Sequence, residues 1–135
     1  TTIKKYQEEL IEQVRKYGYE YELIQNLKMD FTESFNIQFY KPKGGYKTWH
    51  FERNHNTQGR AFAFMTYLND VPKGGTEFYY QDTTTQAKKG DTMIFPAEWT
   101  HTHKSQISKE HEKYIATGWI ELKKDNETDG IANVF

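Results

Sequence analysis

Cysteine is absent from this chain of 135 residues. Its absence excludes disulfide bonds, thiolate metal sites and thiol nucleophiles together. Any metal must therefore be held by histidine, aspartate or glutamate side chains.

Long apolar runs and an excess of positive charge are also missing. No segment approaches the roughly 20 apolar residues of a membrane-spanning helix, and no signal-peptide pattern opens the chain. The formal net charge is -1, so the basic footprint of proteins that neutralise phosphates is lacking. These features predict a cytoplasmic protein with no membrane partner and no clear nucleic-acid footprint. They do not indicate an oligomeric state.

Aromatic residues, by contrast, are abundant. Nine Phe, ten Tyr and three Trp make 16% of an otherwise polar chain, so a few large side chains must supply much of the core. The length fits one folding unit. We expect a single domain over residues 1–135.

The first 17 residues carry apolar side chains at every third or fourth position. This spacing predicts an amphipathic helix, with Thr1 or Thr2 as N-cap and Gly18 just past its end. We expect a helical buttress over about residues 1–30.

Short patterns of alternating apolar and polar residues dominate the rest of the chain. With the turns between them, they predict strands at 35–40, 46–52, 61–68, 76–80, 83–87, 92–95 and 113–122. One helix followed by many short strands is typical of a mainly β fold, a β-sandwich or jelly roll with the helix packed outside. We expect the β core over about residues 34–122 and a polar tail over 123–135.

His50 and Glu52 lie two residues apart in a predicted strand, so both side chains should project from one face. A third ligand from a distant segment would complete a metal site, and His101 and His103 are both candidates. Two histidines and one carboxylate, with open positions left over, form the facial arrangement of non-haem iron(II) oxygenases. A lone His-x-Glu pair is also common as a solvated surface pair.

Further motifs accompany this pair, at Tyr40 to Tyr46, Tyr67 to Asp70, Gly74 to Phe78, Gly90-Asp91, Phe95-Pro96, and Lys113-Tyr114 with Thr117 and Trp119. In order and spacing, the stretch from Phe39 to Trp119 resembles the prolyl-4-hydroxylase-like branch of the 2-oxoglutarate and iron(II)-dependent oxygenases. It looks especially like the short stand-alone members of viruses and bacteria.

The resemblance implies a double-stranded β-helix, which is the jelly-roll core of that family. It also implies that His50, Glu52 and His103 are catalytic iron(II) ligands, and that Lys113 pairs with the distal carboxylate of 2-oxoglutarate. The ten-residue step to Lys113 is what favours His103 over His101. A buried carboxylate needs a charged, hydrogen-bonding partner, which a lysine supplies.

Tyr40, Tyr67 and Thr117 match co-substrate pocket positions of the family, and Trp119 matches the pocket wall. The implied activity is hydroxylation of a C–H bond, with release of succinate and CO2. The implied cofactors are Fe(II), 2-oxoglutarate and O2, with ascorbate as an optional addition. By family analogy the substrate is a prolyl or other protein or peptide residue, or else a small molecule.

Five basic residues surround the first ligand motif, Lys41, Lys43, Lys47, Arg53 and Arg60. Most such runs are solvated, but in this fold the loop would border the mouth of the site and could meet an acidic substrate.

The family's commonest first motif is His-x-Asp, and Glu52 departs from it by one methylene. A carboxylate here argues against halogenation, because halogenating relatives lack it. Two other hypotheses stay open at this point. One is a metal-binding jelly roll without oxygenase activity. The other is a carbohydrate- or peptide-binding β-sandwich whose aromatics form a recognition surface.

Overall fold

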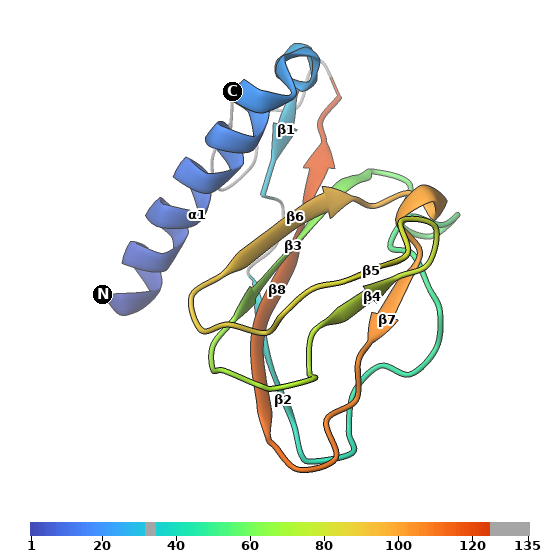
Figure 1. Cartoon of the computed structure of the whole chain (residues 1–135). Coiled ribbons are helices and arrows are strands. Elements are labelled where there is room, and N and C mark those ends of the chain that lie inside the picture. The colour runs from blue at the N-terminus through green and yellow to red at the C-terminus, as the bar shows by residue number, and fades with distance from the viewer. Residues whose placement is uncertain (32–34, 125–135) are drawn as a thin grey trace.

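The computed structural model describes residues 1–31 and 35–124. One long helix lies outside two antiparallel sheets (Figure 1). This arrangement confirms the predicted mainly β jelly roll with an external helix. The predicted polar tail lies outside the described residues from 125 onward.

Helix α1 spans Thr2–Glu20. Thr1 is its N-cap, because the Thr1 side chain accepts a hydrogen bond from the Lys4 amide. Gly18 is buried inside the helix rather than past its end. A short 3-10 helix, η1, follows at Glu22–Asn26.

Among the described residues, the larger sheet has five strands, all paired antiparallel. They are β1 (Met29–Asp30), β2 (Asn36–Tyr40), β3 (Arg60–Tyr67), β6 (Thr92–Pro96) and β8 (Lys113–Leu122). Their order is β1-β8-β3-β6, and β2 pairs with another part of β8. The long strand β8 therefore holds the centre of this sheet.

The smaller sheet has the order β5-β4-β7. Its strands are β4 (Thr76–Phe78), β5 (Thr83–Thr84) and β7 (His103–Ser105), and the 3-10 turn η2 (Trp99–His101) precedes β7. A single bridge between His50 and His103 ties the segment before β3 to the edge of β7.

The predicted strand at 46–52 is wrong. Only His50 makes a strand-like bridge, exchanging two main-chain hydrogen bonds of 3.0 and 2.9 Å with His103. The Glu52 and Arg53 amides instead donate to the Ala97 carbonyl. The chain turns away from β7 after His50, which ends the pairing. The strand predicted at 83–87 is also shorter, and β1 and β7 were not predicted.

Two apolar clusters hold the layers together. The first joins α1 to the larger sheet and contains Leu10, Val14, Met29, Phe31, Phe62, Phe64 and Ile120. The second lies around Tyr67, Val71, Ala87 and Ile115. Aromatic rings contribute to both, as the composition predicted.

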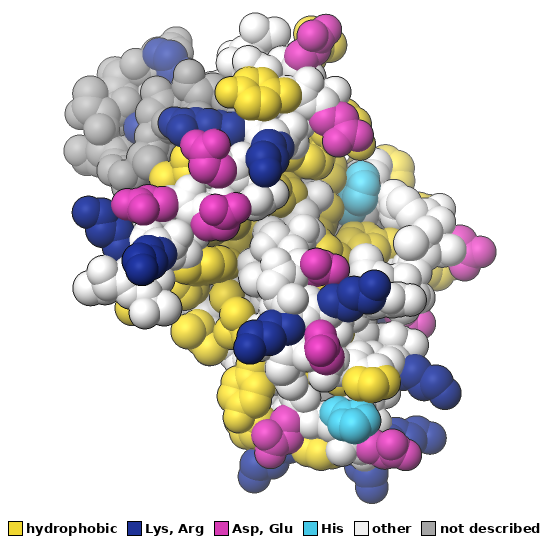
Figure 2. All heavy atoms as spheres, turned by 60° about the vertical axis from the view of Figure 1, so that its left-hand side comes forward, with side chains coloured by type: hydrophobic (Ala, Val, Ile, Leu, Met, Phe, Trp, Pro, Cys, Tyr) yellow, Lys and Arg dark blue, Asp and Glu magenta, His cyan; other side chains and the backbone are white. Residues whose placement is uncertain are grey.

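Surface charge on the side carrying α1 is mixed. Acidic and basic side chains are interspersed there, without a large area of one sign (Figure 2). Within the described part of the chain, no helix has the length and apolar character needed to cross a membrane.

Candidate metal centre and co-substrate pocket

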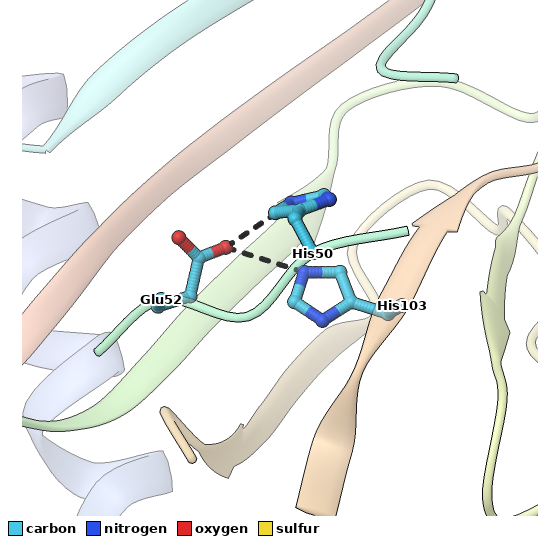
Figure 3. Close-up of side chains that lie close together, drawn as sticks. All are labelled: His50, Glu52 and His103. Carbon is cyan, nitrogen blue, oxygen red and sulfur yellow. Dashed lines mark hydrogen bonds and ion pairs between the residues drawn. The ribbon is translucent and has the colours of Figure 1, made fainter. Parts of the chain in front are cut away.

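Three side chains converge at one end of the smaller sheet (Figure 3). His50 and Glu52 come from the irregular segment before β3, and His103 is the first residue of β7. Oε1 of Glu52 lies 3.5 Å from Nε2 of His50 and 3.2 Å from Nε2 of His103. One ligand atom from each residue falls within 4.8 Å of the others.

The far ring nitrogens of both histidines contact main-chain carbonyls. Nδ1 of His50 lies 2.8 Å from the Thr48 carbonyl oxygen, and Nδ1 of His103 lies 2.7 Å from that of His101. A carbonyl oxygen can only accept, so Nδ1 of each ring must carry a hydrogen. In the neutral imidazole, each Nε2 then keeps a lone pair directed at the centre of the group.

The carboxylate of Glu52 sets the local electrostatics. Burial alone would raise its pKa, but the hydrogen bonds and charges of His103 and His50 outweigh burial and hold the pKa far below the usual range. For His50, burial opposes the charged form, yet the hydrogen bonds to Glu52 and Thr48 and the Glu52 charge raise its pKa overall. Glu52 is thus kept as an anion. Nε2 of His50 and Nε2 of His103 lie beside it, where a metal cation can take the place of a proton.

This donor set fits Fe(II). Metal bonds of about 2.1 Å to nitrogen and oxygen place adjacent ligand atoms about 3 Å apart. The separations of 3.5 and 3.2 Å around Glu52 are close to that value. Three ligands on one side leave room for further ligands on the other.

His101 is not part of this group. It lies in η2, where the 3-10 turn breaks the two-residue alternation that made His101 and His103 equivalent in the sequence. Nδ1 of His101 contacts the Thr100 hydroxyl, and its carbonyl accepts from His103. The structure brings His103, and not His101, to His50 and Glu52.

The main chain of Glu52 is anchored on both sides. Its amide donates to Ala97, while its carbonyl accepts 2.8 Å from the Thr57 hydroxyl and 3.2 Å from Nη1 of Arg60. Sequence patterns gave Thr57 no role. The only sequence signal for this hydrogen bond is a threonine in a polar loop, five residues after a candidate ligand. That signal is not specific.

A cavity of about 400 Å³ opens beside these three side chains. Among the described residues, its walls include Gln38, Tyr40, Tyr46, Phe51, Met65, Thr76, Ile115, Thr117 and Trp119, together with all three of the converging residues. The cavity is large enough for a small dicarboxylate next to the candidate metal position.

Lys113 is buried at the start of β8, with 5% of its surface exposed. Residues two apart on a strand share a face, so Lys113 continues the row that Ile115 and Thr117 make along the cavity. Its ammonium donates to the Gly74 carbonyl at 2.9 Å, and burial lowers its pKa to about 8. Lys113 itself is not among the residues that line the cavity.

The other predicted pocket residues divide into two groups. Tyr40 and Thr117 line the cavity, the first donating to Gln38 Oε1 and the second to the Phe64 carbonyl. Tyr67 does not line it, but its hydroxyl contacts Thr76, which does, at 2.9 Å. Burial raises the pKa of Tyr67. Its inward orientation, expected from the sequence, is confirmed by 1% exposure.

Arg60 and Trp119 form one wall of the cavity. The Arg60 guanidinium carbon lies 3.7 Å from the centroid of the Trp119 ring. Within the described chain, Nε of Arg60 and Nε1 of Trp119 are buried without a hydrogen-bond partner. Arg60 is therefore not the solvated loop residue that most members of a basic run are, whereas Arg53 pairs with Glu98 at the surface.

Comparison with known proteins agrees with this geometry. Residues 35–121 match the model of a family described as the 2OG-Fe(II) oxygenase superfamily. The matched stretch contains all three converging residues and Lys113. No curated protein sequence matches the chain.

Solved structures share the fold. The viral collagen prolyl hydroxylase of Paramecium bursaria Chlorella virus 1, in complex with 2OG, is similar with a TM-score of 0.66 and 24% identity, covering 86% of this chain and 74% of that one. A Pseudomonas putida prolyl-4-hydroxylase is similar with a TM-score of 0.56 and 19% identity, over 69% and 56%. A prolyl 4-hydroxylase of Phytophthora capsici has a TM-score of 0.56 and 23% identity, over 68% and 33%.

Proposed function

Because this chain belongs to the 2OG-Fe(II) oxygenase superfamily, we propose that it hydroxylates a protein or peptide residue, with proline as the leading candidate. The class of reaction follows from the family, which uses Fe(II), 2-oxoglutarate and O2. The solved structures that share its fold and bear the name prolyl hydroxylase support the choice of proline.

We assign the metal to His50, Glu52 and His103. The observation that carries this assignment is the convergence of two Nε2 atoms on one carboxylate, while carbonyls hold the opposite ring nitrogens. When bound there, iron supplies the O2-dependent oxidation that couples conversion of 2-oxoglutarate to succinate and CO2 with hydroxylation of the substrate.

We assign the distal carboxylate of 2-oxoglutarate to Lys113. A buried ammonium that meets only carbonyl oxygens lacks a counter-charge, and a carboxylate would supply one. Among the described residues, Lys113 forms no ion pair. Tyr40 and Thr117 line the cavity, and Lys113 lies on the same face of β8 as Thr117, so the co-substrate would extend from the cavity toward Lys113.

The remaining walls shape the space for the substrate. Met65 and Ile115 are apolar, and Trp119 covers the cavity from the side of Arg60. Tyr46 and Phe51 line the cavity and are about half exposed, so they form part of its mouth. A peptide side chain entering past these rings would lie near the metal position.

Succinate formation from 2-oxoglutarate, with and without Fe(II), tests the proposal, first without substrate and then with a proline-containing peptide. We expect slow Fe(II)-dependent succinate formation that the peptide accelerates, together with a peptide product heavier by one oxygen atom. Tight metal binding without succinate formation would instead indicate a metal-binding jelly roll without oxygenase activity.

A further inference from the structure

Three hydroxyl groups form a hydrogen-bonded chain that ends at the cavity. The Tyr67 hydroxyl oxygen lies 2.9 Å from that of Thr76 and 2.7 Å from that of Thr85. Tyr67 and Thr76 are buried, and Thr85 is half-buried. Thr76 lines the cavity, whereas Thr85 does not. The chain of hydroxyls therefore connects Thr85 to the cavity wall.

Main-chain contacts hold Thr85 in this position. Thr85 directly follows β5, which pairs with β4 (Figure 1). The Thr85 amide donates to the Thr76 carbonyl at 2.9 Å, and the Thr76 amide donates to the Thr85 hydroxyl at 3.0 Å. A Cβ atom on Gly75 would collide with the Thr85 carbonyl, so the glycine permits this close approach. These contacts fix the Thr85 hydroxyl next to Tyr67.

The direction of the first hydrogen bond follows from a count of hydrogens, since each hydroxyl has one to donate. Burial raises the pKa of Tyr67, so its hydroxyl keeps its hydrogen. If Tyr67 donated to Thr85, the Thr85 oxygen would accept from both Tyr67 and the Thr76 amide. The Thr85 hydrogen would then have no acceptor among the described residues. The Thr85 hydroxyl therefore donates to Tyr67.

The hydrogens of Tyr67 and Thr76 remain. One of them bridges the two oxygens, and the other meets only a thioether sulfur. Met65 lies 3.8 Å from the Thr76 oxygen, and Met93 lies 3.8 Å from the Tyr67 oxygen. Sulfur is a weak acceptor, whereas a carboxylate oxygen is a strong one. A carboxylate beside Thr76 would accept the Thr76 hydrogen, while Tyr67 donates to Thr76.

Lys113 lies near this chain of hydroxyls. Tyr67 pairs with Ile115 in the register of β3 and β8, and Lys113 is the neighbouring residue of β8 on the same face. The Lys113 ammonium donates to the carbonyl of Gly74, two residues before Thr76. A carboxylate bound by Lys113 can therefore reach the Thr76 hydroxyl.

We propose that Thr85 is a positioning residue for 2-oxoglutarate. By donating to Tyr67, the Thr85 hydroxyl directs the Tyr67 hydrogen to Thr76 and leaves the Thr76 hydrogen for the distal carboxylate of the co-substrate. Thr85 does not line the cavity, so it acts only through the other two hydroxyls. The proposal rests on the assignment of that carboxylate to Lys113 under the proposed function.

Calorimetric titration of the Mn²⁺-loaded protein without O2 tests the proposal with two ligands. The first ligand is 2-oxoglutarate, and the second is 2-oxovalerate, which has a methyl group in place of the distal carboxylate. Thr85→Val is isosteric but cannot donate. We expect it to weaken 2-oxoglutarate binding about tenfold, the loss of one hydrogen bond to a charged group, and to leave 2-oxovalerate binding unchanged. Thr85→Ser should bind both ligands like the wild type.

Thr84→Val is the matched control, because Thr84 precedes Thr85 and is exposed. It should bind both ligands like the wild type. Three results would overturn the proposal. They are unchanged 2-oxoglutarate binding by Thr85→Val, equal weakening of both ligands by Thr85→Val, and failure of Thr85→Ser to restore binding. Equal weakening would show that the Thr85 hydroxyl supports the fold through the Thr76 amide.

Steady-state succinate formation with Fe(II) gives a second measurement. Thr85→Val should raise KM for 2-oxoglutarate about tenfold and leave kcat nearly unchanged, because the missing hydrogen bond affects binding of the co-substrate.

Lys113→Ala separates this proposal from the proposed function. If Lys113→Ala weakens 2-oxoglutarate binding and Thr85→Val does not, Thr85 has no positioning role and the proposed function stands. If the wild type neither binds 2-oxoglutarate nor forms succinate, the proposed function is refuted, and the role of Thr85 is refuted with it.

Discussion

The Thr57 hydroxyl donates a hydrogen bond of 2.8 Å to the main-chain carbonyl of Glu52 and accepts one of 2.9 Å from the Asn54 amide. One side chain thereby closes the loop that follows the carboxylate. Glutamate is one methylene longer than the aspartate usual in related enzymes, so its carboxylate reaches the metal position only if the main chain is held correspondingly far away. Thr57 supplies part of that restraint.

Thr57→Val should weaken metal binding about tenfold, because the isosteric side chain lacks the hydroxyl and frees the Glu52 carbonyl. Thr57→Ser keeps the hydroxyl and should bind the metal like the wild type. Calorimetric titration of each metal-free variant with Mn²⁺ measures its metal dissociation constant. If Thr57→Val lowers thermal stability but leaves the Mn²⁺ constant unchanged, Thr57 stabilises the loop and does not position Glu52.

Shortening Glu52 tests the reach of its side chain directly. We expect Glu52→Asp to slow succinate formation strongly, since small misplacements in a catalytic group of residues can cost about a hundredfold. Glu52→Ala should be inactive. The rates are compared at saturating Fe(II) and 2-oxoglutarate. Equal rates in the wild type and both variants would remove Glu52 from the site.

Lys113→Ala should raise the apparent constant for 2-oxoglutarate at least tenfold, because loss of one partner of a buried ion pair costs on the order of 3–5 kcal/mol. Metal binding should change little, since Lys113 contacts none of the three converging residues. Initial rates of succinate formation over a range of 2-oxoglutarate concentrations give this constant. An unchanged constant would show that Lys113 does not meet the co-substrate.

The pH dependence of 2-oxoglutarate binding follows from the same lysine. Burial lowers the pKa of Lys113 to about 8, so the free protein loses this charge as pH rises through that value. While Lys113 stays charged, below about pH 8, we expect the affinity for 2-oxoglutarate not to change with pH through this group, and above that pH we expect it to fall. The matched control is Lys113→Arg, which stays charged and should show no such fall. Loss of affinity at the same pH in both proteins would point to another group.

The lowered pKa of Lys113 also affects stability. Above pH 8 the affinity for 2-oxoglutarate should fall, whereas the stability of the free protein should rise. In the unfolded chain Lys113 keeps its proton up to its ordinary pKa of 10.5, whereas the folded protein releases it near pH 8. The unfolded state then binds more protons between these values. When no co-substrate is bound, Lys113 therefore makes the free energy of unfolding increase as the pH rises from about 8 to 10.5.

Sequence periodicity predicted the long regular elements better than the short ones. Strand β8 begins and ends at the predicted residues, Lys113 and Leu122, because its alternation is long and one face is buried. The helix was also predicted, although Gly18 did not end it. Gly18 is one of the buried residues of α1, and a glycine can occupy a helix interior when tertiary packing outweighs its low helix propensity.

The sequence predicted that His50, Glu52 and His103 lie together, but it did not predict the structure that supports them. The sequence paired His50 with Glu52 through a strand that does not form. The two side chains meet because Ala97 and Thr57 hold the main chain of Glu52. Likewise, the choice between His101 and His103 depends on the turn η2, whose presence changes which histidine faces the group. Irregular turns and single hydrogen bonds of this kind leave no periodic signal in the sequence.

A metal titration of two histidine variants tests the central claim most directly. His103→Ala and His101→Ala each remove one imidazole from neighbouring positions, so each controls for the other. With Mn²⁺ added to metal-free protein, we expect His103→Ala to lose binding by far more than His101→Ala, which should stay near the wild type. Full affinity in His103→Ala together with loss in His101→Ala would contradict the assignment of His50, Glu52 and His103 as the metal centre.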